Sequence, residues 1–141
     1  MIHEEICTYV VCKLAMDKGF PQHIGDVAYI VENEYDDEYE VGCCCPIQFI
    51  PDYLPTITAP TQSLLQRWLR EEKGIVVEAI AQPTCSTSKK NCYWWSIKQN
   101  SNGFCYQYEE CSYLLYSDEY YFDTYELALE DALKYALEKL V

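Results

Sequence analysis

The sequence predicts an α+β protein in which about three helices pack against one antiparallel sheet of three to four strands. Apolar residues recur with the 3.6-residue period of a helix near residues 3–18, 60–73 and 124–140. Between the second and third of these segments, the pattern changes to the two-residue period of a strand. Because strands follow one another there without alternating helices, we expect an antiparallel sheet with the helices on one face.

The first predicted helix covers residues 3–18. Glu4 and Glu5 would lie at the positive end of its dipole, and Lys18 lies near its other end. Its apolar stripe has the spacing i, i+3, i+4 and i+7 and consists of Cys7, Val10, Val11 and Leu14. We expect this face to pack inward.

The second predicted helix, residues 60–73, has Pro60 in its first turn, where a missing backbone N–H is tolerated. Gly74 follows the last turn and predicts the end of the helix. Thr58 or Thr61 caps the first turn, and the sequence does not choose between them. The apolar stripe consists of Leu64, Leu65, Trp68 and Leu69.

The third predicted helix, residues 124–140, has the clearest signals. Asp123 and Glu126 have the spacing of a capping box, and Phe122 and Leu127 occupy the positions of a hydrophobic staple. The inward face consists of Tyr125, Leu129, Ala132, Leu133, Ala136, Leu137 and Leu140.

The predicted strands lie near residues 75–82, 93–99 and 104–116. The first is rich in β-branched residues and the second alternates aromatic with polar residues, so we expect these two to be antiparallel neighbours. The third range supplies one strand or two short ones. The segment VAYIV at residues 27–31 is also compatible with a strand.

Residues 1–141 are predicted to form a single domain with an acidic insert at about residues 32–45. Mutual repulsion among the carboxylates of residues 32–40, here called the acidic run, should keep this segment extended and exposed to solvent, and it is compatible with a mobile insert. A calcium loop requires glycine at its sixth position, whereas that position holds Asp37 or Val41 in the two best registers. The six carboxylates of the run are Glu32, Glu34, Asp36, Asp37, Glu38 and Glu40.

The formal net charge of −13 excludes some classes of partner. Residues 19–66 and residues 99–133 contain no lysine or arginine, and such surfaces repel phosphate backbones. We therefore expect no direct binding of nucleic acid. No apolar run approaches the ~18 residues of a membrane span, and the N-terminus lacks the pattern of a secretory signal, so we expect a cytoplasmic protein without membrane contact.

The nine cysteines do not have the spacing of a metal site. Zinc sites use short chelating pairs, whereas here the separations are C-x4-C, C-x6-C and C-x5-C; the best local pair is His3 with Cys7. A reducing cytoplasm disfavours disulfides. We expect no cofactor and no metal, with a cysteine-based metal-binding or redox protein as an alternative.

Catalytic motifs are missing as well. A nucleophilic cysteine needs a nearby histidine, and the chain has two histidines for nine cysteines. The sequence also contains no G-x-S-x-G segment and no phosphate-binding glycine loop. We expect a protein that is not an enzyme and has no catalytic residues.

Lysines and aromatic residues interleave around Trp94 and Trp95, a combination that can stack unpaired bases, although core packing explains it better. Adjacent residues on a strand point to opposite faces, so one of the two tryptophans is expected to be exposed. An exposed tryptophan is a natural anchor for a partner.

The segments PTQSLLQRWLREEKGI at residues 60–75 and FDTYELALEDALKYALEKL at residues 122–140 resemble two blocks shared by short proteins that gut Bacteroidales and their phages or prophages encode. The opening helix that ends in Lys18, Gly19 and Phe20 is similar to theirs too. The resemblance implies an accessory protein of mobile-element origin. That family has no established activity, so it assigns no role to any residue here.

We therefore predict a small acidic protein-interaction module, not an enzyme, of phage or prophage origin that binds a host or phage protein. A DNA mimic that inhibits a nucleic-acid enzyme is a second alternative function. For the oligomeric state, a homodimer is an alternative to a monomer. The residues expected to bind the partner are Glu32, Glu34, Asp36, Asp37, Glu38, Glu40, Trp94 and Trp95.

Overall fold

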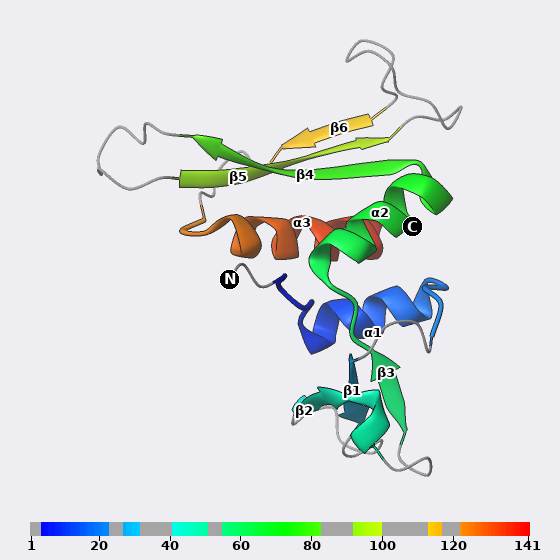
Figure 1. The fold of residues 1–141 in the computed structure, drawn as a ribbon. Helices are drawn as coiled ribbons and strands as arrows, with labels where there is room; N and C mark the ends of the chain where they lie inside the picture. Colours follow the sequence, from blue (N-terminus) through cyan, green and yellow to red (C-terminus); the bar gives the residue numbers. More distant parts are fainter. Residues whose placement is uncertain are drawn as a thin grey trace.

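The computed structural model describes residues 4–22, 27–31, 41–50, 55–82, 92–99, 113–116 and 122–141. These residues form three α-helices, one 3-10 helix and six strands (Figure 1). The order along the chain is α1 (Tyr9–Asp17), β1 (Val27–Val31), β2 (Val41–Pro46), η1 (Ile47–Phe49), β3 (Thr56–Thr58), α2 (Gln62–Lys73), β4 (Ile75–Gln82), β5 (Cys92–Gln99), β6 (Tyr113–Tyr116) and α3 (Tyr125–Lys139).

The α+β class is confirmed, but the prediction of a single sheet is wrong. The described strands form two antiparallel three-stranded sheets, one with the order β4-β5-β6 and one with the order β2-β1-β3. The second sheet leaves little local signal, because β3 has three residues and β2 reads VGCCCP, without a polar–apolar alternation. Only pairing with β1 makes these two segments strands.

The sheet β4-β5-β6 has more strand residues than the sheet β2-β1-β3, and the two are here called the larger and the smaller sheet. The larger sheet agrees with the prediction in its pair β4 and β5. β4 and β5 are antiparallel neighbours, in register from Ile75 opposite Gln99 to Gln82 opposite Cys92. β6 lies within the predicted range of residues 104–116, of which residues 104–112 are outside the described part of the chain. The predicted strand at residues 27–31 is β1.

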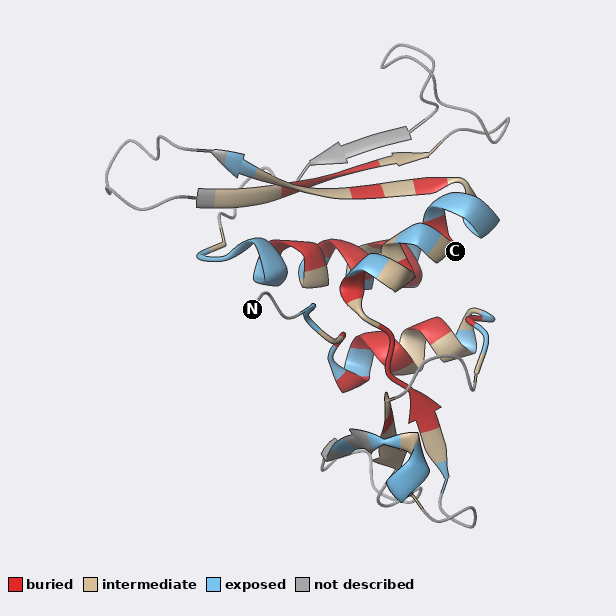
Figure 2. Cartoon of the chain, viewed as in Figure 1, coloured by how far each residue is buried: buried red, intermediate tan, exposed pale blue. Residues whose placement is uncertain are grey.

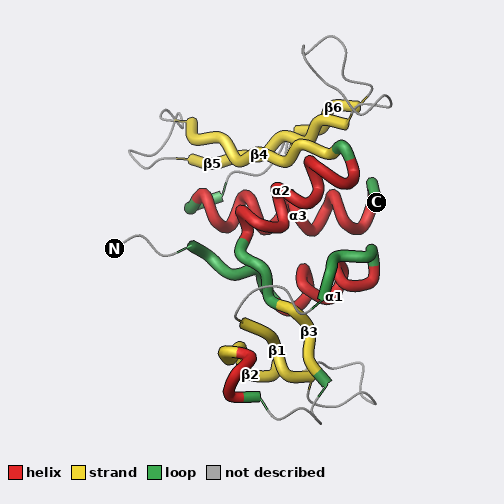
Figure 3. Tube along the Cα trace, turned by 45° about the vertical axis from the view of Figure 1, so that its right-hand side comes forward, coloured by secondary structure: helices red, strands yellow, loops and turns green. Residues whose placement is uncertain are grey.

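The elements are arranged in layers (Figures 1 and 3). α2 packs on β4, and α3 packs on both β4 and β5, so the two helices cover one face of the larger sheet. α1 packs against α3 on the side away from that sheet, and β3 contacts α1. The smaller sheet therefore lies next to α1, on the side away from the larger sheet.

α3 is the central element of the core. Six of its side chains are buried, and they alternate between alanine and leucine: Ala128, Leu129, Ala132, Leu133, Ala136 and Leu137. The small alanines let neighbouring elements approach closely, while the leucines supply the apolar area whose removal from water stabilises the fold. Figure 2 shows α3, much of it coloured as buried, lying between the larger sheet and α1. The prediction of the inward face is confirmed for these residues other than Ala128, which was not predicted. It is wrong for Tyr125, which is 40% exposed.

The predicted start of the first helix is wrong. α1 begins at Tyr9, after Thr8, whose ψ of 160° is extended. Residues 4–8 form an extended segment, here called the strap, which crosses the start of α2. In consequence Val10 is 50% exposed, although it was expected to face inward. Contacts with residues more than fifty positions away hold the strap, so local helix signals could not reveal it.

For the caps of the other two helices, the prediction for α2 is confirmed and the prediction for α3 is wrong. α2 begins at Gln62 with Thr61 as its cap, which decides between the two threonines and leaves Pro60 outside the helix. Gly74 ends α2 in the left-handed region with φ of 66°, as expected of a glycine at this position.

α3 is capped by Thr124, whose hydroxyl accepts a hydrogen bond from the Leu127 N–H at 3.1 Å, and not by Asp123. The predicted capping box is therefore wrong by one residue. With Thr124 as the cap, Leu127 no longer occupies the position of a hydrophobic staple, and its exposed fraction is 55%.

No helix among the described residues has both the length and the apolar character that crossing a bilayer requires.

Candidate functional site

Backbone and side-chain hydrogen bonds fix the strap against α2. The N–H of Cys7 donates to the carbonyl of Pro60 at 3.0 Å, and the N–H of Gln62 donates to the carbonyl of Glu5 at 2.9 Å. These bonds give Ile6 and Thr61 the pairing of an isolated antiparallel bridge. The strap therefore behaves as a short extra strand beside the N-terminus of α2, and its side chains are held in place.

The carboxylate of Glu130 joins three elements. Its Oε1 accepts hydrogen bonds from the Thr8 N–H at 2.7 Å and the Thr8 hydroxyl at 2.6 Å, and its Oε2 accepts one from Gln62 Nε2 at 2.8 Å. Thr8 is the N-cap of α1, which has no acidic residue in its first turn. Glu130 thus supplies from α3 the negative charge that the positive end of α1 favours.

Two pockets lie between the strap and the start of α3. Their volumes are about 170 and 310 Å³. Neither contains a lysine, arginine or histidine among its lining residues, and both contain Glu5, Gln62 and Glu126. The surface that combines these carboxylates with exposed apolar side chains is here called the acidic face, and it consists of Glu5, Tyr125, Glu126, Leu127 and Glu130.

Tyr125 and Leu127 give the acidic face its apolar character. They are 40% and 55% exposed, and each lines one of the two pockets. Tyr125 also makes an edge-to-face contact with Tyr93 of β5, and the two ring centroids lie 6.4 Å apart, within the usual range for aromatic pairs. Packing within the chain therefore uses only part of these two side chains.

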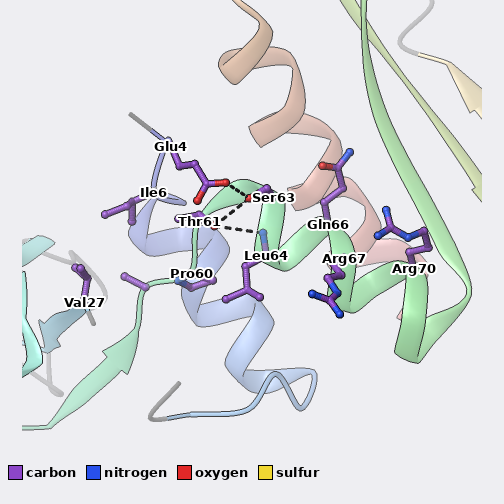
Figure 4. A pocket seen from close by; sticks show the side chains of 11 residues that line it. Glu4, Ile6, Val27, Pro60, Thr61, Ser63, Leu64, Gln66, Arg67 and Arg70 are labelled. Atoms are coloured by element: carbon purple, nitrogen blue, oxygen red, sulfur yellow. Dashed lines mark hydrogen bonds between the residues drawn. The ribbon is translucent and has the colours of Figure 1, made fainter. Parts of the chain in front are cut away.

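A larger groove runs between the strap, α2 and the start of β1, and its volume is about 640 Å³. It is here called the arginine groove, and Figure 4 shows the residues that line it. Its apolar lining residues include Ile6, Val27, Pro60 and Leu64, and its cationic lining residues are Arg67 and Arg70.

The thiols next to the strap are poor nucleophiles. Burial, and secondarily the nearby Glu130, raises the pKa of Cys7 well above its ordinary value and that of Cys12 to about 12. Burial also raises the pKa of Tyr29, whose hydroxyl donates to the carbonyl of Cys7 at 2.8 Å. Cys7 and Cys12 are thus thiols at neutral pH, whereas metal binding and redox chemistry need thiolates. Among the described residues, no three His, Cys, Asp or Glu side chains are grouped so that they could hold a metal ion.

The two predicted tryptophans lie on opposite faces of β5. Trp95 is 5% exposed, donates its indole N–H to Asp131 Oδ2 at 2.8 Å and packs on Tyr135 of α3. Trp94 points to the other face of the sheet and is half-buried. Trp95 is therefore part of the core and is not available to a partner.

The acidic run predicted to bind a partner, residues 32–40, lies outside the described part of the chain, and so do His3 and His23. Of the cysteine triplet, the side chain of Cys44 is described and is exposed. The structure instead brings together Glu5, Glu126 and Leu127, which sequence reasoning assigned to helix dipole, capping and staple positions. The sequence signals that could have revealed these helix starts were Thr8 and Thr124, since each is a good N-cap just before an apolar segment.

Comparisons with protein families, with curated proteins and with solved structures give no match. The resemblance of residues 60–75 and 122–140 to proteins of gut Bacteroidales and their phages stays a prediction.

Proposed function

We propose that this chain is a small protein-interaction module, of phage or prophage origin and without catalytic activity, that binds a host or phage protein through the acidic face. The observation that carries the proposal is the exposure of Tyr125 and Leu127 among carboxylates, next to pockets lined by no cationic residue. Exposed apolar side chains with a charged rim are typical of protein-binding sites.

The electrostatics of the acidic face favour a basic partner. Glu5 and Glu126 are exposed and Glu130 is half-buried within one small area, and an approaching lysine or arginine would find no competing cation among the lining residues. Charge complementarity of this kind raises the association rate and selects the partner more than it adds affinity. A second copy of the chain would bring like charges together, so a homodimer through this face is disfavoured.

The apolar contribution to binding is modest but useful. Covering the exposed part of Leu127 removes roughly half a leucine side chain from water, which contributes about 1 kcal/mol. The partly exposed ring of Tyr125 contributes about as much. Affinity of practical strength therefore needs both the apolar anchor and the charged rim, which is the combination that the acidic face offers. A mimic of DNA would need carboxylates alone, and the apolar anchor favours an ordinary protein partner over that alternative.

The proposal is tested with immobilised protein and a bacterial lysate at 50 and 150 mM NaCl. The variant E5Q/E126Q/L127S removes two charges and one apolar anchor from the acidic face. The control D17N/E72Q/F49S removes two exposed charges and one exposed apolar side chain elsewhere. We expect one protein to be captured by the wild type and the control, and to be lost with the first variant. Equal capture by all three, or no specific capture, would contradict the proposal.

A further inference from the structure

The arginine groove has an unusual composition for this chain. Arg67 and Arg70 are its only two arginines, in a protein with a formal net charge of −13, and both line the same groove. The volume of about 640 Å³ is in the range of known ligand sites. Residues three apart on a helix lie on the same face, so α2 places both arginines on one wall of the groove.

The groove is apolar at one end and cationic at the other. Figure 4 shows Val27 and Ile6 at one end, Pro60 and Leu64 in the middle, and Arg67 and Arg70 toward the opposite end. Glu4 also lines the groove, at the end away from the arginines, and its carboxylate accepts a hydrogen bond from the Ser63 hydroxyl at 2.5 Å. An occupant that matches this arrangement has an apolar part and a separate anionic part.

Both guanidinium groups can donate hydrogen bonds to a carboxylate of a ligand. The ion pair between Arg67 and Glu71 joins Nε to Oε1 at 2.9 Å, which leaves the terminal nitrogens of Arg67 for another acceptor. Arg70 is exposed, and among the described residues no carboxylate lies within 4.0 Å of it. Two guanidinium groups one helical turn apart suit planar carboxylates, which they bind through paired hydrogen bonds.

The strength of these interactions restricts the class of ligand. Exposed ion pairs contribute little by themselves, so an isolated small anion would not be held. A polyanion would be repelled by the rest of the surface. At about 0.1 M salt, however, charges more than ~10 Å away are screened, so one or two carboxylates respond mainly to the local arginines. Apolar contact at Ile6, Pro60 and Leu64 must supply the rest of the binding free energy.

We propose that the arginine groove binds an extended peptide segment in which acidic side chains follow leucine-like apolar side chains. The spacing supports a peptide: Leu64 and Arg70 are six residues apart on α2, or ~9 Å, which an extended peptide spans in about three residues. This site is separate from the acidic face and does not depend on the function proposed for it.

The test uses a fluorescein-labelled peptide of ten residues, with three leucines in its first half and two glutamates three residues further on. Fluorescence anisotropy at 100 mM NaCl measures its binding to the full chain. We expect saturable binding that R67Q/R70Q weakens about tenfold. The control K134Q/K139Q removes two exposed cations from α3, outside the groove, and should change binding by less than about twofold.

Changes in the peptide keep the test independent of protein stability. Glutamine in place of the glutamates should weaken binding as much as R67Q/R70Q does, and serine in place of the leucines should abolish it. Absence of binding, or equal binding by R67Q/R70Q and wild type, would overturn the proposal. Displacement of the peptide by decanoate at equal concentration would also overturn it, since the site would then belong to a small amphiphilic carboxylate.

Discussion

Replacement of Glu130 by alanine should be among the most destabilising changes at the surface of this protein. The change removes the acceptor of three hydrogen bonds, from the Thr8 N–H at 2.7 Å, the Thr8 hydroxyl at 2.6 Å and Gln62 Nε2 at 2.8 Å. It also removes the negative charge at the positive end of α1. Three elements that lie far apart in the sequence would lose their common contact.

The magnitude follows from these contacts. The partly buried bond from Gln62 to a charged acceptor contributes about 1.5 kcal/mol. The two bonds from Thr8 are exposed, so water replaces much of them and they contribute about 1 kcal/mol together. The interaction with the dipole of α1 contributes about 0.5 kcal/mol. We therefore expect E130A to lower the free energy of unfolding by about 3 kcal/mol and Tm by about 10 °C.

Urea denaturation followed by far-UV circular dichroism measures this change, and an unaltered m-value shows that the transition is comparable. E130Q keeps an acceptor for Thr8 but loses the charge and turns an amide group toward Gln62, so it should cost about half as much. The control E138A removes another carboxylate of α3, whose ion pair with Lys134 is exposed at 4.0 Å, and should cost less than about 0.5 kcal/mol. Equal effects of E130A and E138A would refute the reasoning.

Three further results are expected. Iodoacetamide at pH 7.5 should modify Cys44 and leave Cys7 and Cys12 unmodified by mass spectrometry, because burial keeps both protonated; labelling of Cys12 as fast as Cys44 would contradict this. Because the folded pKa of Cys12 is raised from 9.0 to about 12, its contribution to stability is complete below pH 9 and is lost as the pH rises toward 12. Urea midpoints at pH 8, 9 and 10 should fall less steeply for C12A than for wild type, and parallel curves would exclude Cys12 as the cause. D131A should cost about 1–2 kcal/mol, because the buried indole N–H of Trp95 loses its acceptor, while D131N should restore most of the loss; equal costs would disprove a hydrogen-bonding role.

Local signals explain what could be predicted. The interiors of the three helices follow from their apolar periodicity, and the end of α2 follows from Gly74, whose positive φ few other residues adopt. β4 and β5 follow from alternation on two segments that are close in sequence and pair over eight positions. Each of these features depends on residues within a few turns or one hairpin of one another.

The candidate site could not be predicted in the same way. The helix signals around Glu4 and Glu5 compete with pairing of the strap to residues 60–62, which forms only when the chain has folded. In α3, Asp123 and Thr124 are both good caps, and the choice of Thr124 takes Leu127 out of the position of a hydrophobic staple.

The amino-acid sequence by itself determined the α+β class, the three helices, the central strand pair and the excess negative charge, because these depend on composition and on short-range periodicity. Only the tertiary structure decided that there are two sheets among the described residues, that the strap crosses α2, and that carboxylates gather around Tyr125 and Leu127 while both arginines line another groove. The reason is physical: Thr8 and Glu130 are 122 positions apart, and no local pattern encodes a contact at that separation.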